Sequence, residues 1–186
     1  MSKALSISEA AHCLRHDGVI AIATESVWGL SCDPSSIKAL EKLIAIKKRS
    51  AQKGFIIIAA DFNQVLHWIN QDALSQDRLE HIQSTWPGAH TWLMPPSAAV
   101  LDLCKGQYET IAVRISAHPD VQKLAECMPY GMTSTSCNYS NQAAPSTFEE
   151  VDKNLLAMID GYVPSIVSGN PQPSRIQDSQ SLTFIR

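Results

Sequence analysis

The sequence lacks the features of membrane-spanning, secreted and disulfide-bonded proteins. No apolar run approaches the ~20 residues that cross a bilayer, and residues 1–18 contain no apolar segment followed by a cleavage site. The five cysteines are odd in number and include no Cys-x-x-Cys pair, a usage typical of reduced thiols. We therefore expect a soluble cytoplasmic protein with no membrane partner.

The motifs of several enzyme classes are also missing. Neither GxxxxGK[ST] nor GxGxxG occurs, which argues against P-loop and Rossmann nucleotide binding. The missing GxSxG argues against a serine hydrolase. His12 and His16 have the four-residue spacing of metal ligands, but they lack the acid of HExxH and a third ligand nearby. We predict an exposed helix face there and no protein metal site.

Positive charge is scarce overall but locally concentrated. The net charge is -3, so the whole chain does not attract nucleic acid, and binding of a polyanion requires a local patch. Such a patch lies in residues 38–53, where six basic residues stand against the single acid Glu41: Lys38, Lys42, Lys47, Lys48, Arg49 and Lys53. For Lys38 and Lys42 a solvated helix face is the preferred interpretation.

Hydrophobic residues are plentiful, at 45% of 186 residues, which is enough for a single domain spanning 1–186. Capping and periodicity predict helices between Ser6 and Gly18, from Asp33-Pro34, at 62–69 and 76–85, from Pro119 to Met128, and from the overlapping capping boxes at 146–150 to Gly161. Apolar runs predict strands at 18–24, 55–60, between Pro87 and Pro95, and at 110–116, 132–136, 165–169 and 181–186, with a loop at 170–178. This alternation predicts an α/β fold, a twisted, open, mixed sheet with flanking helices.

Polar residues recur in steps of two near the predicted strand ends. They are Ser134, Ser136 and Asn138; Lys47 and Arg49; and Thr110 and Arg114. Such spacing brings hydroxyls, an amide and cations together in one cleft of an open sheet, where they suit an anion. The bland interpretation of STSCNYSN (134–141) is a Ser/Asn-rich surface turn. Arg114 lies in an apolar strand, and its partner is either a structural acid or an anionic ligand.

Six stretches in order resemble the YrdC/Sua5 family and cover nearly the whole chain. ATESVWGLSCDP (23–34) is similar to Pro-Thr-Glu-x-Val-Tyr-Gly-Leu, IKKRSAQKG (46–54) to Lys-x-Arg-Pro, and WPGAHT (86–91) to Pro-Gly-Pro-x-Thr. TIAVRISAHP (110–119) resembles the arginine-bearing strand, STSCNYSN the Ser-Thr-Ser-Ala-Asn-x-Ser-Gly motif, and PSRIQD (173–178) Pro-Ser-x-Ile-x-Asp.

The resemblance implies the family's fold with a large, positively lined cavity and a nucleotidyltransferase activity. L-threonine, bicarbonate or CO2, and ATP would yield threonylcarbamoyl adenylate and diphosphate, for N6-threonylcarbamoyladenosine beside the tRNA anticodon. Mg2+ would arrive on the ATP phosphates, with no tightly bound cofactor. Proteins of the later threonylcarbamoyl transfer would be functional partners, and tRNA a further one.

By the same resemblance, each site residue receives an expected role. ATP would contact Arg49, Lys53, Thr110, Ser136 and Asn138, threonine would contact Thr24, Ser26, Arg114, Ser134 and Ser174, and Lys47 and Arg49 would be catalytic.

The chain departs from the family pattern at four positions. Ala23, Ser50 and Ala89 replace prolines, which could loosen turns that line the site. Asn141 replaces a glycine, a mild change because asparagine tolerates the left-handed conformation. A divergent paralogue using another amine, and an RNA-binding module, stay open as alternatives.

Overall fold

Helices and strands alternate along residues 2–169 and 174–186, which the computed structural model describes. The strands are β1 (Lys3–Ala4), β2 (Ile20–Ala23), β3 (Trp28–Ser31), β4 (Ile56–Ala59), β5 (His90–Met94), β6 (Ile111–Ile115), β7 (Met132–Ser136), β8 (Gly161–Tyr162) and β9 (Arg175–Asp178). The α-helices are α1 (Ile7–Arg15), α2 (Ile37–Lys47), α3 (Phe62–Leu66), α4 (Gln76–Ser84), α5 (Asp102–Lys105), α6 (Pro119–Glu126) and α7 (Lys153–Met158).

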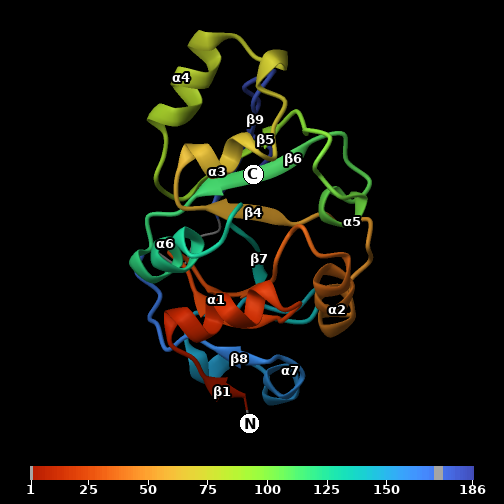
Figure 1. Ribbon diagram of the computed structural model, residues 1–186, viewed down its shortest axis with the longest axis vertical. Helices are drawn as coiled ribbons and strands as arrows, with labels where there is room; N and C mark the ends of the chain where they lie inside the picture. The colour runs from red at the N-terminus through yellow and green to blue at the C-terminus, as the bar shows by residue number, and fades with distance from the viewer. Residues whose placement is uncertain (1, 170–173) are drawn as a thin grey trace.

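The strands form one nine-stranded sheet over the described ranges, in the order β1-β8-β2-β3-β7-β4-β6-β5-β9. β4 and β6 run parallel, whereas β7 is antiparallel to both β4 and β3. Figure 1 shows β1, β8 and α7 at one end of the long axis and α4 at the other. The predicted α/β fold on an open, mixed sheet is confirmed.

Side-chain alternation along β4 separates two cores. Ile57 and Ala59 belong to one hydrophobic cluster, and Ile58 belongs to a second cluster, which α1 and α6 cover. Ile58 pairs with Arg114 on β6 and with Met132 on β7, so these side chains share one face of the sheet. Further along this face, the side chains of β7 change from apolar, at Met132, to polar, at Ser134 and Ser136.

Helix starts follow their capping chemistry, with one correction. The Ser6–Glu9 capping box begins α1 as predicted. Helix α2, however, begins after Ser36 and not at Asp33-Pro34, because the Asp33 carboxylate accepts from the Ser35 backbone N–H at 2.8 Å and closes a turn. The Ser36 hydroxyl then accepts from the Ala39 N–H and caps the helix.

The predicted helix after residue 146 is interrupted. The Thr147–Glu150 capping box supports only a 3-10 turn over Phe148–Glu150. Asp152 is a second N-cap and starts α7, which is a separate short helix. Gly161, predicted as the helix terminator, lies in β8 and pairs with Ile20.

The C-terminal strands were predicted in the wrong places. Residues 165–169 form no strand, and residues 181–186 form an isolated Phe184–Gln177 bridge and a few backbone hydrogen bonds to β9 instead of a strand. The regular strand is β9, inside the predicted loop 170–178, of which residues 170–173 lie outside the described residues. Residues 175–178 form a strand because they pair in parallel with β5, which lies too far away in the sequence for local patterns to reveal the pairing. The Asp178 side chain accepts from the Ser181 N–H at 2.7 Å and turns the chain back along β9.

A membrane-spanning helix, long and apolar, does not occur within residues 2–169 and 174–186.

Candidate active site

The polar part of the sheet face opens into a cavity of about 480 Å³. Its floor follows the two-residue period of neighbouring strands: Ser134 and Ser136 on β7, Ile56 on β4, and Ala112 and Arg114 on β6. Eight of the eleven predicted site residues line it: Thr24, Ser26, Arg49, Thr110, Arg114, Ser134, Ser136 and Ser174. Lys47, Lys53 and Asn138 lie outside this lining.

Arg114 pairs with a structural acid and also keeps donors free for an anionic ligand, the two partners that the sequence left open. Its Nη2 donates to Glu25 Oε2 at 2.9 Å, so a structural acid compensates the charge. Yet Arg114 also lines the cavity, and its buried Nε has no hydrogen-bond partner among the described residues. Burial lowers the pKa of Arg114, and Glu25 opposes that shift. The Nε atom is enclosed by protein, so the donor that can reach an anionic ligand is Nη1, which has no hydrogen-bond partner among the described residues and is not enclosed.

Arg49 folds the basic loop into a wall of the cavity. Its Nε donates to the Lys53 carbonyl at 2.9 Å and its Nη2 to the Gly54 carbonyl at 2.7 Å. Nη1 donates to Thr135 Oγ1 at 3.1 Å, which ties the loop to β7. The guanidinium also lies over the Phe55 ring, 5.1 Å from its centroid. These contacts fix the orientation of a cation that faces the cavity.

Lys47 is fully buried and lies beneath the serine-rich segment, away from the cavity. Its Nζ donates to the Ser136 carbonyl, to the Asn138 carbonyl at 2.8 Å and to Asn138 Oδ1 at 3.3 Å. Burial, together with the nearby Arg49 charge, lowers the pKa of Lys47 to about 8. Lys53 is exposed at the end of the same loop.

Residues 134–138 form the end of β7 and the residues just after it, next to the cavity, and they are not a surface turn. Ser134 and Ser136 line the cavity, whereas Cys137 is buried. The Ser136 hydroxyl donates to Asn138 Oδ1, and Asn138 Nδ2 donates to the Gln142 carbonyl at 2.6 Å. Asn138 therefore orients a hydroxyl that faces the cavity.

The serine and threonine residues at the far side of the cavity are buried and held in place. Ser174 and Thr91 share a hydrogen bond of 3.0 Å between their hydroxyl oxygens. Thr24 Oγ1 donates to the Val27 carbonyl at 2.8 Å and shapes the turn that carries Ser26. Both Thr24 and Ser26 are about 5% exposed, so they face only the cavity.

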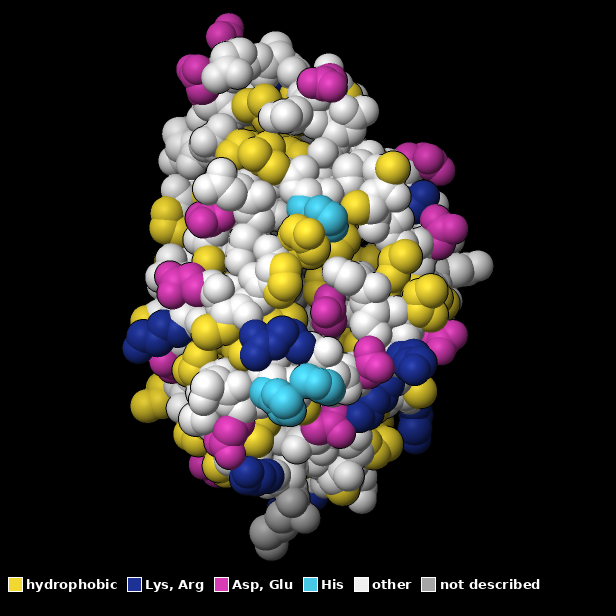
Figure 2. Space-filling view, viewed as in Figure 1, with side chains coloured by type: hydrophobic (Ala, Val, Ile, Leu, Met, Phe, Trp, Pro, Cys, Tyr) yellow, Lys and Arg dark blue, Asp and Glu magenta, His cyan; other side chains and the backbone are white. Residues whose placement is uncertain are grey.

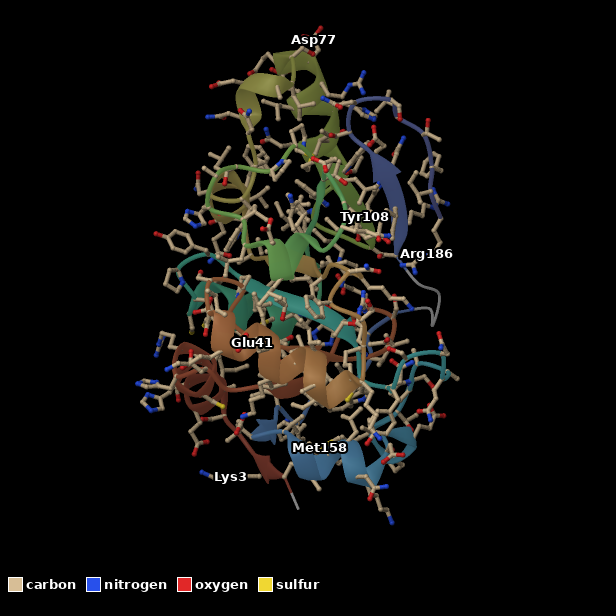
Figure 3. All side chains as sticks on the ribbon, turned by 90° about the vertical axis from the view of Figure 1, so that its right-hand side faces the viewer. Lys3, Glu41, Asp77, Tyr108, Met158 and Arg186 are labelled. Carbon is tan, nitrogen blue, oxygen red and sulfur yellow. The ribbon has the colours of Figure 1, made fainter. Side chains whose placement is uncertain are left out.

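Sequence reasoning missed several polar and charged residues around the cavity. Lys105, Tyr108 and Arg186 line it, while Glu25 and Thr91 hold residues that do. Figure 3 shows Tyr108 and Arg186 on the same side of the molecule and at similar height. Glu25 could have been suspected from the sequence, because it lies between Thr24 and Ser26, two residues already assigned to the site. No signal marked Arg186, because its approach to Ser174 depends on the turn at Asp178.

The donor set of the cavity suits anionic oxygen atoms. Arg49, Lys105, Arg114 and Arg186 bring positive charge to it, and no acidic side chain lines it within the described ranges. The same part of the chain contains no group of three or more His, Cys, Asp or Glu residues that could hold a metal ion. Guanidinium groups bind carboxylate and phosphate oxygens, and neighbouring hydroxyls can donate further hydrogen bonds to the same oxygens.

Hydrogen bonds replace the missing prolines at two of the turns. The Ala23 N–H, which a proline would lack, donates to Ser165 Oγ at 3.0 Å. Ser50 Oγ accepts from the Gln52 N–H at 3.3 Å and its carbonyl accepts from the Lys53 N–H at 3.1 Å. These two turns therefore keep a fixed shape without the ring.

Asn141 adopts the predicted left-handed conformation, with φ of 70°. We expect Asn141→Ala to lower the free energy of unfolding by about 1 kcal/mol, because alanine tolerates this conformation poorly. Asn141→Gly is expected to leave the free energy unchanged or to raise it slightly. Urea denaturation of the three proteins measures both changes, and a less stable glycine variant would contradict the backbone explanation.

Comparison with known proteins places this geometry in a family. The Sua5/YciO/YrdC family model, described as telomere recombination, matches residues 12–186. A threonylcarbamoyl-AMP synthase of Xylella fastidiosa (strain M12) is 39% identical over 186 residues, which is 100% of both chains.

Solved structures agree with the sequence comparison. P. abyssi Sua5 complexed with L-threonine has a TM-score of 0.83 and 26% identity, over 92% of this chain and 50% of that chain. This chain therefore spans about half of that protein. E. coli YciO, at 21% identity, shares the fold with a TM-score of 0.83 over 97% of this chain and 87% of that chain. The chain belongs to the Sua5/YciO/YrdC family.

Proposed function

We infer that this protein is a threonylcarbamoyl-AMP synthase, a nucleotidyltransferase that serves threonylcarbamoyladenosine modification of tRNA. The observation that carries the assignment is the alignment with a relative of that name at 39% identity over the full length of both chains. The cavity supplies independent support, since it collects cations and hydroxyls on one face of the sheet.

The reaction that we assign needs positioning and charge more than a protein nucleophile. Bicarbonate takes up a proton and loses water to form CO2, and the amine of L-threonine adds to CO2 and releases a proton, which gives a carbamate. A carbamate oxygen then attacks the α-phosphorus of ATP, and the bond to the diphosphate leaving group breaks. Displacements at phosphorus depend mainly on alignment and on compensation of negative charge. The guanidinium groups and hydroxyls of the cavity provide both.

L-threonine fits the side of the cavity around Arg114. We place its carboxylate on the N–H groups of Arg114 that Glu25 leaves free, next to the hydroxyls of Ser134 and Ser174. Thr24 and Ser26 complete this subsite from the β2–β3 turn. P. abyssi Sua5, which has a similar fold, forms a complex with L-threonine and supports this choice of substrate.

ATP fits the opposite side, near the basic loop. We assign its phosphates to Arg49, Thr110 and Ser136, with Lys53 and Asn138 approaching from outside the lining. The hydroxyl and guanidinium donors fit phosphate oxygens, and Mg2+ carried on the nucleotide would supply charge compensation on its phosphates. Lys47 supports this side through the backbone of β7.

The distribution of surface charge favours RNA binding less than it favours the synthase function. Figure 2 shows basic and acidic side chains interspersed on the visible face, without a continuous basic patch. The net charge of -3 adds no general attraction to a polyanion. We propose that residues 1–186 act as one domain in the cytoplasm, where the later threonylcarbamoyl-transfer proteins use the product. Contact with tRNA is not required for the reaction itself.

A diphosphate-release assay tests the function directly. The protein receives ATP, Mg2+ and bicarbonate, with and without L-threonine, and mass spectrometry identifies the adenylate. We expect diphosphate release that depends on threonine and an equal amount of threonylcarbamoyl adenylate. Serine and glycine in place of threonine test the divergent-paralogue alternative. Release that is independent of every amine would contradict the assignment, and salt-sensitive tRNA binding would then favour the RNA module.

A further inference from the structure

Glu25 is a buried acid beside the cavity to which the assigned chemistry gives no role. It lies in the turn between β2 and β3 and is 9% exposed. Its carboxylate accepts three hydrogen bonds: from Arg114 Nη2 at 2.9 Å, from Ser116 Oγ at 2.9 Å and from the Ala117 N–H at 2.8 Å. Such a fully bonded carboxylate is rigid as well as charged.

Arg114 needs such a partner more than an exposed arginine would. Its side chain is 6% exposed, and an unpaired cation at that depth is strongly disfavoured. Glu25 supplies a full negative charge to Nη2 of the guanidinium, while Nη1, which is not enclosed, stays without a partner in the described part of the chain. The guanidinium is thus neutralised and oriented, and donor capacity is left for a ligand.

We propose that Glu25 is a positioning residue that sets the orientation of Arg114 for the carboxylate of the amino acid substrate. This role rests on the proposed function, because it assumes that Arg114 binds that carboxylate. Glu25 itself does not line the cavity. It acts through Arg114 and touches no substrate.

A role as general base for the threonine amine fits the geometry less well. The Glu25 carboxylate oxygens are occupied by the three donors from β6 and the residues after it. Burial alone would raise the pKa of Glu25, but Arg114, backbone N–H groups and Ser116 lower it below its usual value. A bonded carboxylate of lowered pKa is a poor proton acceptor.

A short polar network holds Glu25 in turn. Ser116 Oγ accepts from the His118 N–H at 3.1 Å, and His118 Nδ1 accepts from the Asp120 N–H at 3.3 Å. His118 Nε2 therefore carries the ring proton and donates to the Ile166 carbonyl at 2.9 Å. The residues between β6 and α6 thus hold the Glu25 carboxylate in place, and that carboxylate in turn orients Arg114.

Glu25→Gln tests the proposal, with Glu149→Gln, the same change at an exposed position outside the cavity, as the matched control. The amide keeps the shape, but it loses the charge and cannot accept from all three donors. We expect the KM for L-threonine to rise about 30-fold in Glu25→Gln, as when one partner of a buried charge pair is removed. The KM for ATP should change by less than about twofold, and Glu149→Gln should stay within about twofold of wild type for both substrates.

A purely structural role for Glu25 predicts a different pattern. Loss of folded protein would lower the apparent kcat and leave both KM values unchanged, and that result would overturn the proposal. Glu25→Asp, which restores the charge one methylene away, is expected to recover part of the threonine KM. If Glu25→Asp and Glu25→Gln behaved alike, charge compensation of Arg114 would be excluded.

An NMR measurement separates this proposal from the proposed function. The Nε–Hε resonance of Arg114, identified by its loss in Arg114→Lys, is expected to be sharp in the wild type and broadened or shifted in Glu25→Gln. This readout needs no turnover. An unchanged resonance in Glu25→Gln would overturn the positioning role even in an active enzyme. A changed resonance in a protein without threonine-dependent activity would instead locate the failure in the proposed function.

Discussion

Arg114→Lys is expected to reduce kcat/KM for L-threonine about a thousandfold, the largest effect of any single substitution that we predict. Lysine keeps the charge and pairs with Glu25, so the protein should fold. It lacks the forked N–H groups, and losing about two charged hydrogen bonds to the substrate carboxylate amounts to roughly 4 kcal/mol. Steady-state diphosphate release at varied threonine measures the loss, which should fall mainly on KM.

The control for Arg114→Lys is Arg175→Lys. Arg175 is exposed on β9, and its hydrogen bond in the sheet comes from the backbone N–H to the Ala89 carbonyl. The same chemical change there should leave kcat/KM within about twofold of wild type. A threonine KM in Arg114→Lys that stayed within tenfold of wild type would show that the carboxylate binds elsewhere. Arg114→Met is a weaker test, because it leaves Glu25 buried without its cation and so destabilises the fold as well as the site.

How far the sequence predicted the fold depended on the distance between interacting residues. The alternation in residues 110–116 correctly placed Val113 and Ile115 in the core and Arg114 at the cavity, because the period of a strand is a local property, although Ile111 reaches both. The capping box at Ser6 likewise located α1 from a few neighbouring residues. β9 could not be found this way. Its strand character comes from pairing with β5, more than 80 residues earlier in the chain.

The site shows the same division. Hydroxyls at steps of two along β7 predicted the cavity floor, and the structure places Ser134 and Ser136 there. The direction of Lys47 was not predictable, since it depends on how the end of α2 packs under β7. The partner of Arg114 was equally hidden, because Glu25 approaches from a turn 89 residues away.

Lys47→Met is expected to lower kcat/KM for ATP about a hundredfold, although Lys47 does not line the cavity. The Nζ donates to the carbonyls of Ser136 and Asn138 and so fixes the backbone at the end of β7. Methionine fills similar space without donors, and the segment that carries the Ser136 hydroxyl should move. A displacement of about 1 Å in a positioned group is enough for such a loss.

Lys48→Met provides a matched control for the charge. Lys48 is the next residue, is exposed, and lies with its Nζ 5.0 Å from the Tyr139 ring centroid. It undergoes the same change in charge and side chain, and we expect its kcat/KM for ATP to stay within about twofold of wild type. Equal losses in the two variants would show that general electrostatic attraction, and not the backbone contacts of Lys47, supports ATP binding.

The pH dependence of stability tests the burial of Lys47 independently of activity. Its pKa is lowered from an ordinary 10.5 to about 8, mainly by burial and also by Arg49. Between pH 8 and 10.5 the unfolded chain therefore binds more protons at this residue than the folded chain, so the contribution of Lys47 to stability rises with pH. Below about pH 8 the full cost of the buried cation is present, of the order of 3 kcal/mol. Wild type should gain stability relative to Lys47→Met as pH rises from 8 to 10 in urea denaturation. A difference that stayed flat over that range would mean that the carbonyl oxygens around Nζ hold its pKa near the ordinary value.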